Sequence, residues 1–418
     1  MKLLFVYPSL NTISGYQTGI GYIIALLKEK GHEVQLFRVV VRNDIPRLMK
    51  KVNILKPDII AFSSISTQFK WVSLIAAMLK TVIKSKALLI CGGIHPTLEP
   101  DCLLGCSDLD GIVRGEGEYP MLELAERLDK KRQYFDIKNF YFRQNSNIIK
   151  NDLRPVIDNL DQLPFPYRTV PDYSVSEASF IFSRGCFFNC SFCCNHALKH
   201  LYKDENVRFR SSEKAVDEVE MVTKCCRNLK CIRFDDDIFT LDKLWLHRFL
   251  NLYRKKVRRK FICNARVDTV DLDTFKLLKS SGCMQVRMGI ETGDERLRKE
   301  VLHKSISDAQ IIKAFTWAKE AGLQTFSLNM IGLPYETPRL FQKTIHLNKI
   351  LKVDIPLLYV FHPYPKTALS QLCLKEGFIK KEEMCGNFTF VERNDTILNM
   401  PRFRRKDILK YFRNFYRF

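Results

Sequence analysis

The chain has 418 residues, of which 46% are hydrophobic and 27% charged, so it is long enough for two or three domains with sizeable cores. This composition excludes disorder over most of the length, and no apolar run approaches the ~18 residues that a membrane-spanning helix needs. The formal net charge is 67 − 46 = +21, and the first residues, MKLLFVYPSL, are too short an apolar run for a signal peptide, so we expect a cytoplasmic protein.

Residues 1–150 alternate apolar runs that predict strands with patterns that predict helices. The expected strands are 2–8, 32–40, 58–64, 87–93 and 111–118, and the expected helices are 19–31, 45–56 and 70–84. This alternation indicates βαβ units and a doubly wound parallel sheet of the Rossmann or flavodoxin type. Such sheets bind ligands beyond the carboxyl ends of their strands, where this sequence carries Ser63, Ser64, Gly92, Gly93 and Gly115. Glycines there let a bulky ligand approach the backbone, although ordinary strand-to-helix turns use them equally.

Residues 151–175 contain four prolines and no sustained periodicity, which predicts a linker. A second α/β series occupies 176–385, with strands expected at 178–183, 231–234, 260–263, 284–288, 325–329 and 356–361. Polar or glycine-rich sequence follows each strand at once. Chemistry-bearing residues at the ends of successive parallel strands are typical of a β/α-barrel active site, and six strands indicate a partial (β/α)6 barrel. The last segment, 386–418, is basic and aromatic, and it predicts either contact with nucleic acid or anionic lipid or a solvated helix face.

Three of the 14 cysteines stand close together in the segment SRGCFFNCSFCC, directly after the first barrel strand. Cys186, Cys190 and Cys193 have the spacing CxxxCxxC, so three thiolates on one short loop can each bind a different iron of a 4Fe–4S cube. The fourth iron then has no protein ligand and is open to a substrate or cofactor. The competing interpretation is a zinc site that includes the nearby Cys194 and His196, because structural zinc takes four ligands. We expect Cys194 to point away from the loop and pack.

Within this loop, Phe192 offers an aromatic face beside the open iron. The pattern CxxxCxΦC, in which Φ is aromatic, resembles the radical S-adenosylmethionine (SAM) superfamily. The segments GGIHPT, RGEGE, LPFPYR, FDDDIFT, NARVDT, GIETG, MIGLPYET and HPYPKT resemble, in that order, the landmarks of radical SAM enzymes that carry a cobalamin (B12)-binding domain. The resemblance extends over residues 1–385 and implies a cobalamin-binding domain at 1–150 and a radical SAM barrel at 176–385.

The resemblance implies that SAM binds the open iron of the 4Fe–4S cluster. One electron from the cluster then cleaves SAM to a 5′-deoxyadenosyl radical, which abstracts hydrogen from an unactivated C–H bond. The resemblance assigns to SAM the following residues: Asp235, Asp236 and Asp237 at the methionine amino group, Arg266 at the carboxylate, Glu291 at the ribose or methionyl part, and Gly332 and Glu336 beside the adenine. Each assignment has a structural alternative. The aspartates can cap a helix, Glu291 can form a salt bridge at a strand end, and Gly332 can belong to an ordinary turn.

Cobalamin is expected although the family's DxHxxG motif is missing. After the first strand the chain reads YPSLNTISGYQTG, with no histidine to bind cobalt, and His32 and His95 lie elsewhere. Some members of the family lack this histidine, so the corrin ring can rest on the 63–67 and 92–93 loops without a protein nitrogen ligand. The alternative is a domain that has lost cobalamin. With cobalamin bound, the implied activity is methylcobalamin-dependent methylation of an unactivated carbon.

Two other enzyme classes remain open. One is a radical SAM cyclase or rearrangement enzyme. The other is a tRNA methylthiotransferase-like enzyme without cobalamin, which needs additional cluster cysteines in the first domain, where only Cys91, Cys102 and Cys106 are present. The expected partners are a small-molecule or lipid substrate and an external one-electron donor such as flavodoxin or ferredoxin, and no nucleic-acid partner is expected.

Overall fold

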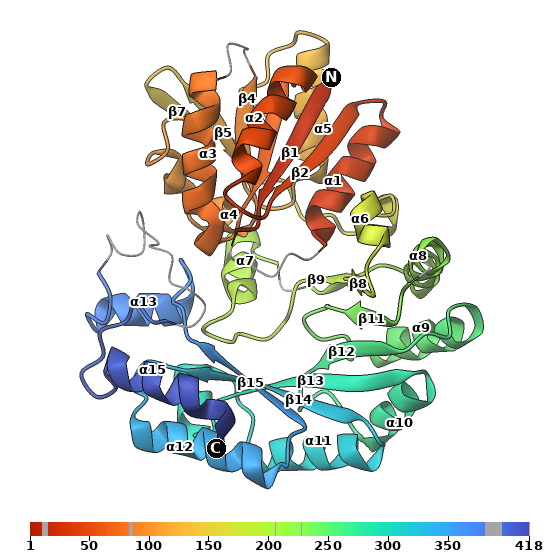
Figure 1. The fold of residues 1–418 in the computed structure, drawn as a ribbon, viewed down its shortest axis with the longest axis vertical. Helices are drawn as coiled ribbons and strands as arrows, with labels where there is room; N and C mark the ends of the chain where they lie inside the picture. The colour runs from red at the N-terminus through yellow and green to blue at the C-terminus, as the bar shows by residue number, and fades with distance from the viewer. Residues whose placement is uncertain (11–15, 83–86, 205, 227, 381–394, 418) are drawn as a thin grey trace. The chain divides into compact units, whose positions relative to one another are not determined.

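The computed structural model describes residues 1–10, 16–82, 87–204, 206–226, 228–380 and 395–417. The described residues form two compact units, one built from 1–158 and 162–169 and the other from 159–161, 170–380 and 395–417 (Figure 1). Each unit contains a large, mainly parallel sheet with helices packed against it. Within the described residues, no helix is both long enough and apolar enough to cross a membrane.

The first unit is a seven-stranded sheet in the order β2-β1-β3-β4-β5-β6-β7, in which β1 to β5 are parallel. This order reverses direction at β1, as the doubly wound prediction requires. The strands are β1 (Lys2–Pro8), β2 (Glu33–Val39), β3 (Ile59–Ser63), β4 (Leu88–Gly92), β5 (Gly111–Val113), β6 (Phe140–Gln144) and β7 (Asn147–Lys150). The helices are α1 (Thr18–Glu29), α2 (Asp44–Leu55), α3 (Phe69–Val82), α4 (Ile94–Leu98) and α5 (Glu118–Asp129).

Apolar side chains cover both faces of this sheet. One core lies between the sheet and α2 and α3, and the other lies on the side of α1 and α5. Helix α1 supplies Ile20, Ile24 and Leu27 to the second core, at the spacing of one helix face. Strands β6 and β7 form an antiparallel hairpin that extends the sheet, and Asn145 in its two-residue turn has φ 53°. Asparagine tolerates that left-handed conformation, which the tight turns of hairpins require.

The second unit is a six-stranded sheet in the order β8-β11-β12-β13-β14-β15, and every neighbouring pair is parallel. Strands that follow one another around the sheet in chain order form a partial barrel, so the predicted fold class is confirmed. The strands are β8 (Glu177–Phe180), β11 (Cys231–Phe234), β12 (Phe261–Ala265), β13 (Cys283–Glu291), β14 (Gln324–Ile331) and β15 (Ile355–Val360), and β9 (Ser183–Arg184) pairs with β10 (Arg208–Phe209). The helices are α6 (Val170–Tyr173), α7 (Cys194–Tyr202), α8 (Ser212–Cys225), α9 (Lys243–Lys256), α10 (Leu272–Ser280), α11 (Asp308–Glu320), α12 (Pro338–Ile350), α13 (Ala368–Lys375) and α15 (Arg405–Asn414).

Six successive helices of the barrel, α8 to α13, begin with a side chain that accepts a hydrogen bond from the first turn. Each such cap stabilises its helix by about 1 kcal/mol and fixes where the strand-to-helix loop ends. The loops that carry polar sequence are therefore held at both ends, by a strand and by a capped helix. The capping residues are Ser211, Asp242, Asp271, Ser307, Thr337 and Thr367.

Candidate functional site

The three-cysteine loop lies beyond the carboxyl end of β8, the first barrel strand. It begins at Gly185, whose φ of +92° and close approach to the Asn206 carbonyl leave no room for a side chain. Cys186 and Cys193 are half-buried, Cys190 is buried, and all three are free thiols. Because Cys193 directly precedes α7, the loop ends where that helix begins.

Hydrogen bonds hold the loop against the rest of the barrel through its central residue, Ser191. The Ser191 hydroxyl donates to the Val301 carbonyl at 2.6 Å, and its amide donates to the Leu302 carbonyl at 2.9 Å. The Leu369 amide at the start of α13 donates to the Ser191 carbonyl at 2.8 Å. The cysteines therefore stand on a backbone that two other elements fix in place.

Two buried cations lie beside Cys190. The Arg266 Nη1 donates to the Cys190 Sγ at 3.3 Å, while its guanidinium stacks 3.7 Å from the Phe188 ring centre and pairs with Asp268 at 2.7 Å. Burial raises the pKa of the Cys190 thiol, and the positive charges of Lys304 and Arg266 oppose that rise because they favour the thiolate. Three free thiols, one of them beside two cations, suit a thiolate-ligated iron–sulfur cluster.

The alternative of a zinc site would need Cys194 or His196 in addition to the three cysteines. Among the described residues, no group of three or more His, Cys, Asp or Glu side chains is placed to hold a single metal ion. His196 is buried and its Nε2 accepts from the Ala368 amide at 2.9 Å, so the ring fastens α7 to α13. Cys194 is half-buried and its thiol lies near that of Cys193, which raises the pKa of the Cys193 thiol, and the expectation that Cys194 packs away from the loop stays a prediction.

Two of the three consecutive aspartates that follow β11 already have an ion-pair or hydrogen-bond partner within the protein. Asp235 pairs with the guanidinium of Arg233 at 2.9 Å. The buried Asp236 Oδ1 accepts from the amides of Phe182 at 2.8 Å and Ser183 at 2.6 Å, and burial raises the pKa of Asp236 to about 6. Strand β8 ends at Phe180, opposite Phe234, the last residue of β11, and so stops short of the expected Ser183. Asp235 and Asp236 thus have structural partners, and their assignment to SAM stays a prediction.

Asp237 is the aspartate of this run that faces the cysteine loop. Its carboxylate accepts from Asn195 Nδ2 at 2.7 Å. Burial raises the pKa of the Cys186 thiol to about 11, and the negative charge of Asp237 adds to that rise, so the two groups are close. None of the three aspartates caps α9, because Asp242 occupies that position.

Glu291 ends β13 at a positive φ of 67° and forms a buried ion pair. The Lys304 Nζ lies 2.8 Å from the Glu291 Oε1 and 2.8 Å from the Gly289 carbonyl. A Cβ at Gly289 would lie 2.2 Å from the Glu291 Oε1, so glycine is required for this pair to form. The salt-bridge alternative is therefore present in the structure, and the assignment of Glu291 to SAM stays a prediction.

Gly332 and Glu336 form one turn beyond β14. The Glu336 Oε2 accepts from the amides of Gly332 at 2.7 Å and Leu333 at 3.3 Å. Its Oε1 is buried and has no hydrogen-bond partner among the described residues. Burial raises the pKa of Glu336 to about 8, so the carboxyl group is largely protonated at neutral pH.

In the first unit, the predicted ligand-binding residues come together at the carboxyl edge of the sheet. The Ser64 amide donates to the Gly92 carbonyl at 2.9 Å, which joins the loops after β3 and β4. Gly93 has φ +101°, and a Cβ there would lie 2.6 Å from the Ser64 carbonyl oxygen and 3.1 Å from the Ser63 hydroxyl. Backbone and small side chains thus form this edge, as close approach by a bulky cofactor requires.

Thr97 connects the loop after β5, which contains Gly115, to the same edge of the sheet. Its hydroxyl donates to the Gly93 carbonyl at 2.7 Å and accepts from the Gly115 amide at 2.8 Å. His95 is buried, lies 3.2 Å from the Ser66 hydroxyl through Nδ1, and has a pKa lowered by burial to about 4. The part of the first loop that lacks the cobalt-binding histidine, 11–15, lies outside the described residues.

The cysteines that a second cluster would need lie in the apolar core of the first unit. Cys91 and Cys106 are buried and Cys102 is half-buried among the leucines, isoleucines and valines between the sheet and α2 and α3. Burial raises the pKa of the Cys91 thiol well above its ordinary value, and Cys102 and Cys106 add to that rise, whereas two cations oppose the rise at Cys190. These cysteines behave as small apolar residues.

Lys304 is the residue at this site that the sequence did not single out. It is one of many lysines, and its position beside Cys190 depends on the π-helix 297–301 that precedes it. Single-turn π-helices occur frequently at functional sites, but they have no sequence signature. The other contacts that sequence could not supply are those of Phe188 with Arg266 and of Ser191 with the end of that π-helix.

Two family models match the chain. The model of the radical SAM superfamily matches residues 180–347, and the model of the B12 binding domain matches residues 14–125. The first match covers most of the second unit's sheet and the second covers β2 to β5 of the first unit's sheet. The matched ranges contain the cysteine loop and the loops at the carboxyl edge of the first sheet.

Similar proteins include both methyltransferases and a cyclase. An uncharacterized methyltransferase of Pyrococcus horikoshii is 28% identical over 435 residues, which span 100% of this chain and 92% of that protein. The anaerobic magnesium-protoporphyrin IX monomethyl ester cyclase of Rubrivivax gelatinosus is 25% identical over 407 residues, 89% of this chain and 70% of that protein. The structure of the radical SAM methyltransferase TsrM of Kitasatospora setae, with cobalamin and a [4Fe-4S] cluster bound, has a TM-score of 0.73 at 16% identity, over 89% of this chain and 78% of that one.

Proposed function

Because the chain belongs to the radical SAM enzymes that carry a B12-binding domain, we propose that it methylates an unactivated carbon atom of a small-molecule or lipid substrate. The observation that carries this proposal is the loop of three free thiols at the end of the first barrel strand, held in place by Ser191 and flanked by two buried cations. The methyltransferases among its relatives and structural neighbours support the choice of methyl transfer.

The cysteine loop would hold the cluster. Cys186, Cys190 and Cys193 provide three thiolate ligands for a cube with four irons, which leaves one iron for SAM. A 4Fe–4S cluster so bound supplies the single electron that cleaves the sulfonium of SAM to a 5′-deoxyadenosyl radical. Arg266 and Lys304 offset the negative charge that gathers at Cys190, since both cations are buried beside it.

Some of the residues assigned to SAM already bind other parts of the protein, so the groups with an oxygen or amide left over are the better candidates for SAM contacts. Asp237 is the aspartate suited to the cationic methionine amine, because Asp235 and Asp236 are bound by Arg233 and by backbone amides. Glu291 keeps one oxygen on Lys304, and its second oxygen can accept from a ribose hydroxyl. Gly332, whose turn is fixed by Glu336, would present backbone groups to the adenine.

The first unit would hold cobalamin, which supplies a carrier for the methyl group. The edge formed by Ser63, Ser64, Gly92, Gly93 and Gly115 offers backbone groups and small side chains to the corrin ring. The segment between β1 and α1 contains no histidine, so the protein would hold cobalamin through the backbone groups and small side chains of this edge rather than through an imidazole of that segment.

A cyclisation or rearrangement is the second candidate. The Rubrivivax gelatinosus cyclase matches 89% of this chain, and the geometry of the cysteine loop serves either reaction. Both activities begin with the same hydrogen abstraction, and the entry of a methyl group from SAM into the product distinguishes methylation from cyclisation or rearrangement.

The test is the formation of 5′-deoxyadenosine from SAM by anaerobically reconstituted protein with dithionite as the reductant. We expect formation by the wild type and by Cys194→Ala, and none by Cys190→Ala. Retention of cobalamin after equilibrium dialysis supports methyl transfer over cyclisation without cobalamin. Full 5′-deoxyadenosine formation by Cys190→Ala would refute the ligand assignment, and absence of cobalamin retention would refute cobalamin-dependent methylation.

A further inference from the structure

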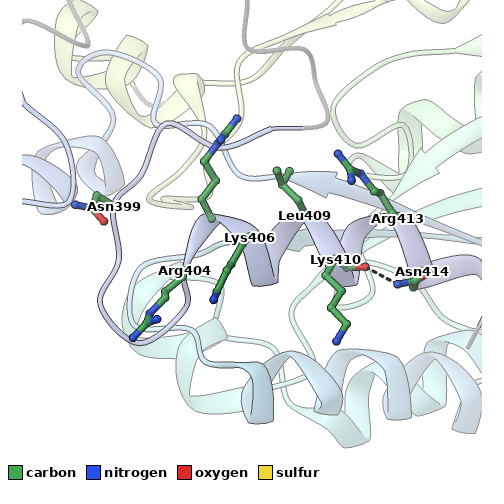
Figure 2. A pocket seen from close by; sticks show the side chains of 8 residues that line it. Asn399, Arg404, Lys406, Leu409, Lys410, Arg413 and Asn414 are labelled. Atoms are coloured by element: carbon green, nitrogen blue, oxygen red, sulfur yellow. Dashed lines mark hydrogen bonds between the residues drawn. The ribbon is translucent and has the colours of Figure 1, made fainter.

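The C-terminal helix α15 presents a basic groove to solvent. The groove has a volume of about 930 Å³, and Figure 2 shows that α15 and the segment leading to it provide its lining. This volume is far larger than a single inorganic anion fills, so a surface loop of a partner fits better. The five basic residues that line it, here called the basic groove, are all exposed: Arg404, Arg405, Lys406, Lys410 and Arg413.

Within the described part of the chain, Asp395 is the acidic residue that compensates the charge of the groove, through Arg405 and Arg413. Arg405 pairs with Asp395, whereas Arg404, Lys406 and Lys410 form no ion pair with any described residue. None of the described residues that line the groove is acidic. Lys406 and Lys410 are four residues apart and extend from the same side of the helix in Figure 2, so they form one charged row.

The opposite face of α15 and the residues flanking it pack against the barrel. Phe403 and Phe415 are buried, and their rings contact the Phe341 ring of α12 at centroid distances of 6.5 and 6.2 Å. A single-stranded nucleic acid needs exposed aromatic rings on which its bases stack, and a membrane-bound helix needs an exposed apolar face. The described residues that line the groove include no aromatic ring and one apolar side chain, Leu409, so the groove suits an acidic protein surface better than nucleic acid or lipid.

The groove is connected to the cysteine loop through α13. The first helical residue, Ala368, donates to His196 of α7, and the next, Leu369, donates to Ser191 in the cysteine loop. Beyond the other end of α13, the Phe378 carbonyl accepts from the amide of Asn399, which lines the groove. Helix α13 has eight residues and is therefore about 12 Å long, so one short helix connects the groove to the cluster loop.

We infer that the basic groove docks an acidic one-electron carrier protein that reduces the cluster. The inference rests on the proposed function, because a radical SAM enzyme takes its electron from an external reductant. The carrier gives up one electron and the cluster gains it, with no other bond made or broken. Complementary charge guides such an encounter and raises its rate, while the electron passes only after docking.

The experiment compares two charge reversals in the full-length, reconstituted protein. The test variant is Lys406→Glu/Lys410→Glu, in the groove. The control variant is Arg254→Glu/Lys255→Glu, at the exposed end of α9, which makes the same change in net charge on another basic surface. Binding of reduced flavodoxin is measured by titration, and 5′-deoxyadenosine formation is measured with flavodoxin and, separately, with dithionite.

We expect the groove variant to bind flavodoxin about tenfold more weakly and to lose kcat/KM for flavodoxin by a similar factor. Added salt should weaken wild-type binding and affect the groove variant less. The rate with dithionite should be equal in all three proteins, since a small reductant needs no docking surface. The α9 variant should behave as the wild type.

The inference is overturned if the groove variant binds flavodoxin as tightly as the wild type does, or if the α9 variant loses as much affinity. It is also overturned if RNA or phosphatidylserine vesicles bind the groove and flavodoxin does not. An absence of 5′-deoxyadenosine with dithionite in every variant would instead refute the proposed function, and the binding titration would still decide the docking surface.

Discussion

The buried carboxyl group of Glu336 makes stability depend on pH in a direction opposite to that of most carboxyl groups. Its pKa in the folded protein is about 8, against an ordinary value of 4.5, because burial disfavours the charged form. Between these two pH values the folded chain keeps a proton that the unfolded chain has lost. The free energy of unfolding therefore falls as pH rises from 4.5 to 8, by about 1.4 kcal/mol per pH unit and about 5 kcal/mol in total.

The perturbation is Glu336→Gln, which keeps an oxygen for the amides of Gly332 and Leu333 and cannot ionise. The free energy of unfolding of the variant should not fall with pH in this way. The difference in unfolding free energy between the variant and the wild type should therefore shift in favour of the variant by about 4 kcal/mol between pH 5 and pH 8. The unfolding of the cluster-free chain in urea is monitored through hydrogen exchange in peptides from β14 and α12. Glu320→Gln, an exposed position on α11, is the control and should show a constant difference from the wild type. A constant difference for Glu336→Gln as well would refute the assignment of a neutral buried carboxyl group.

Three further substitutions test other contacts. Gly93→Ala should lower stability by about 2 kcal/mol and abolish cobalamin retention in dialysis, because its Cβ meets neighbouring backbone at a positive φ. The control Gly92→Ala should lower the melting temperature much less, since its Cβ has only ordinary contacts. Equal melting temperatures of the two would contradict this. Gly289→Ala should break the buried ion pair at the end of β13 and weaken SAM binding by about tenfold in a filter assay, since its Cβ overlaps a carboxylate oxygen; unchanged binding would remove that pair from the site. Arg266→Gln should lower the cluster's reduction potential by about 60 mV in an EPR titration, because a charge-assisted hydrogen bond to Cys190 worth about 1.4 kcal/mol is lost. A potential that stays the same or rises would show that Arg266 does not stabilise the reduced cluster.

The architecture was largely predictable because its signals are local. The apolar runs at 2–8 and 231–234 are strands with the expected bounds. The β6–β7 hairpin was missed although a signal existed, since two polar residues that include Asn145 separate two β-prone runs. That signal was weaker than the strand–helix alternation that dominates the first 150 residues.

The contacts at the site were less predictable because they join residues far apart in the chain. The spacing of the cysteines pointed to the loop, but nothing in the sequence indicates that Asp236 turns its carboxylate to the Phe182 amide rather than to a ligand. Likewise, nothing in the sequence indicates that Lys304, just after a π-helix, lies close enough to Cys190 to favour its thiolate. Sequence therefore identified the kind of chemistry, while the structure separated the residues that bear structural bonds from those left available.

The measurement that tests the account most directly is electron–nuclear double resonance of the reduced, anaerobically prepared protein with SAM labelled at its methionine amino nitrogen and carboxylate oxygen. The account predicts about four irons per chain and hyperfine coupling of both labels to the cluster, because SAM chelates the iron that Cys186, Cys190 and Cys193 leave free. Protein that contains about one zinc and no iron, or a cluster that shows no coupling to either label, would contradict it.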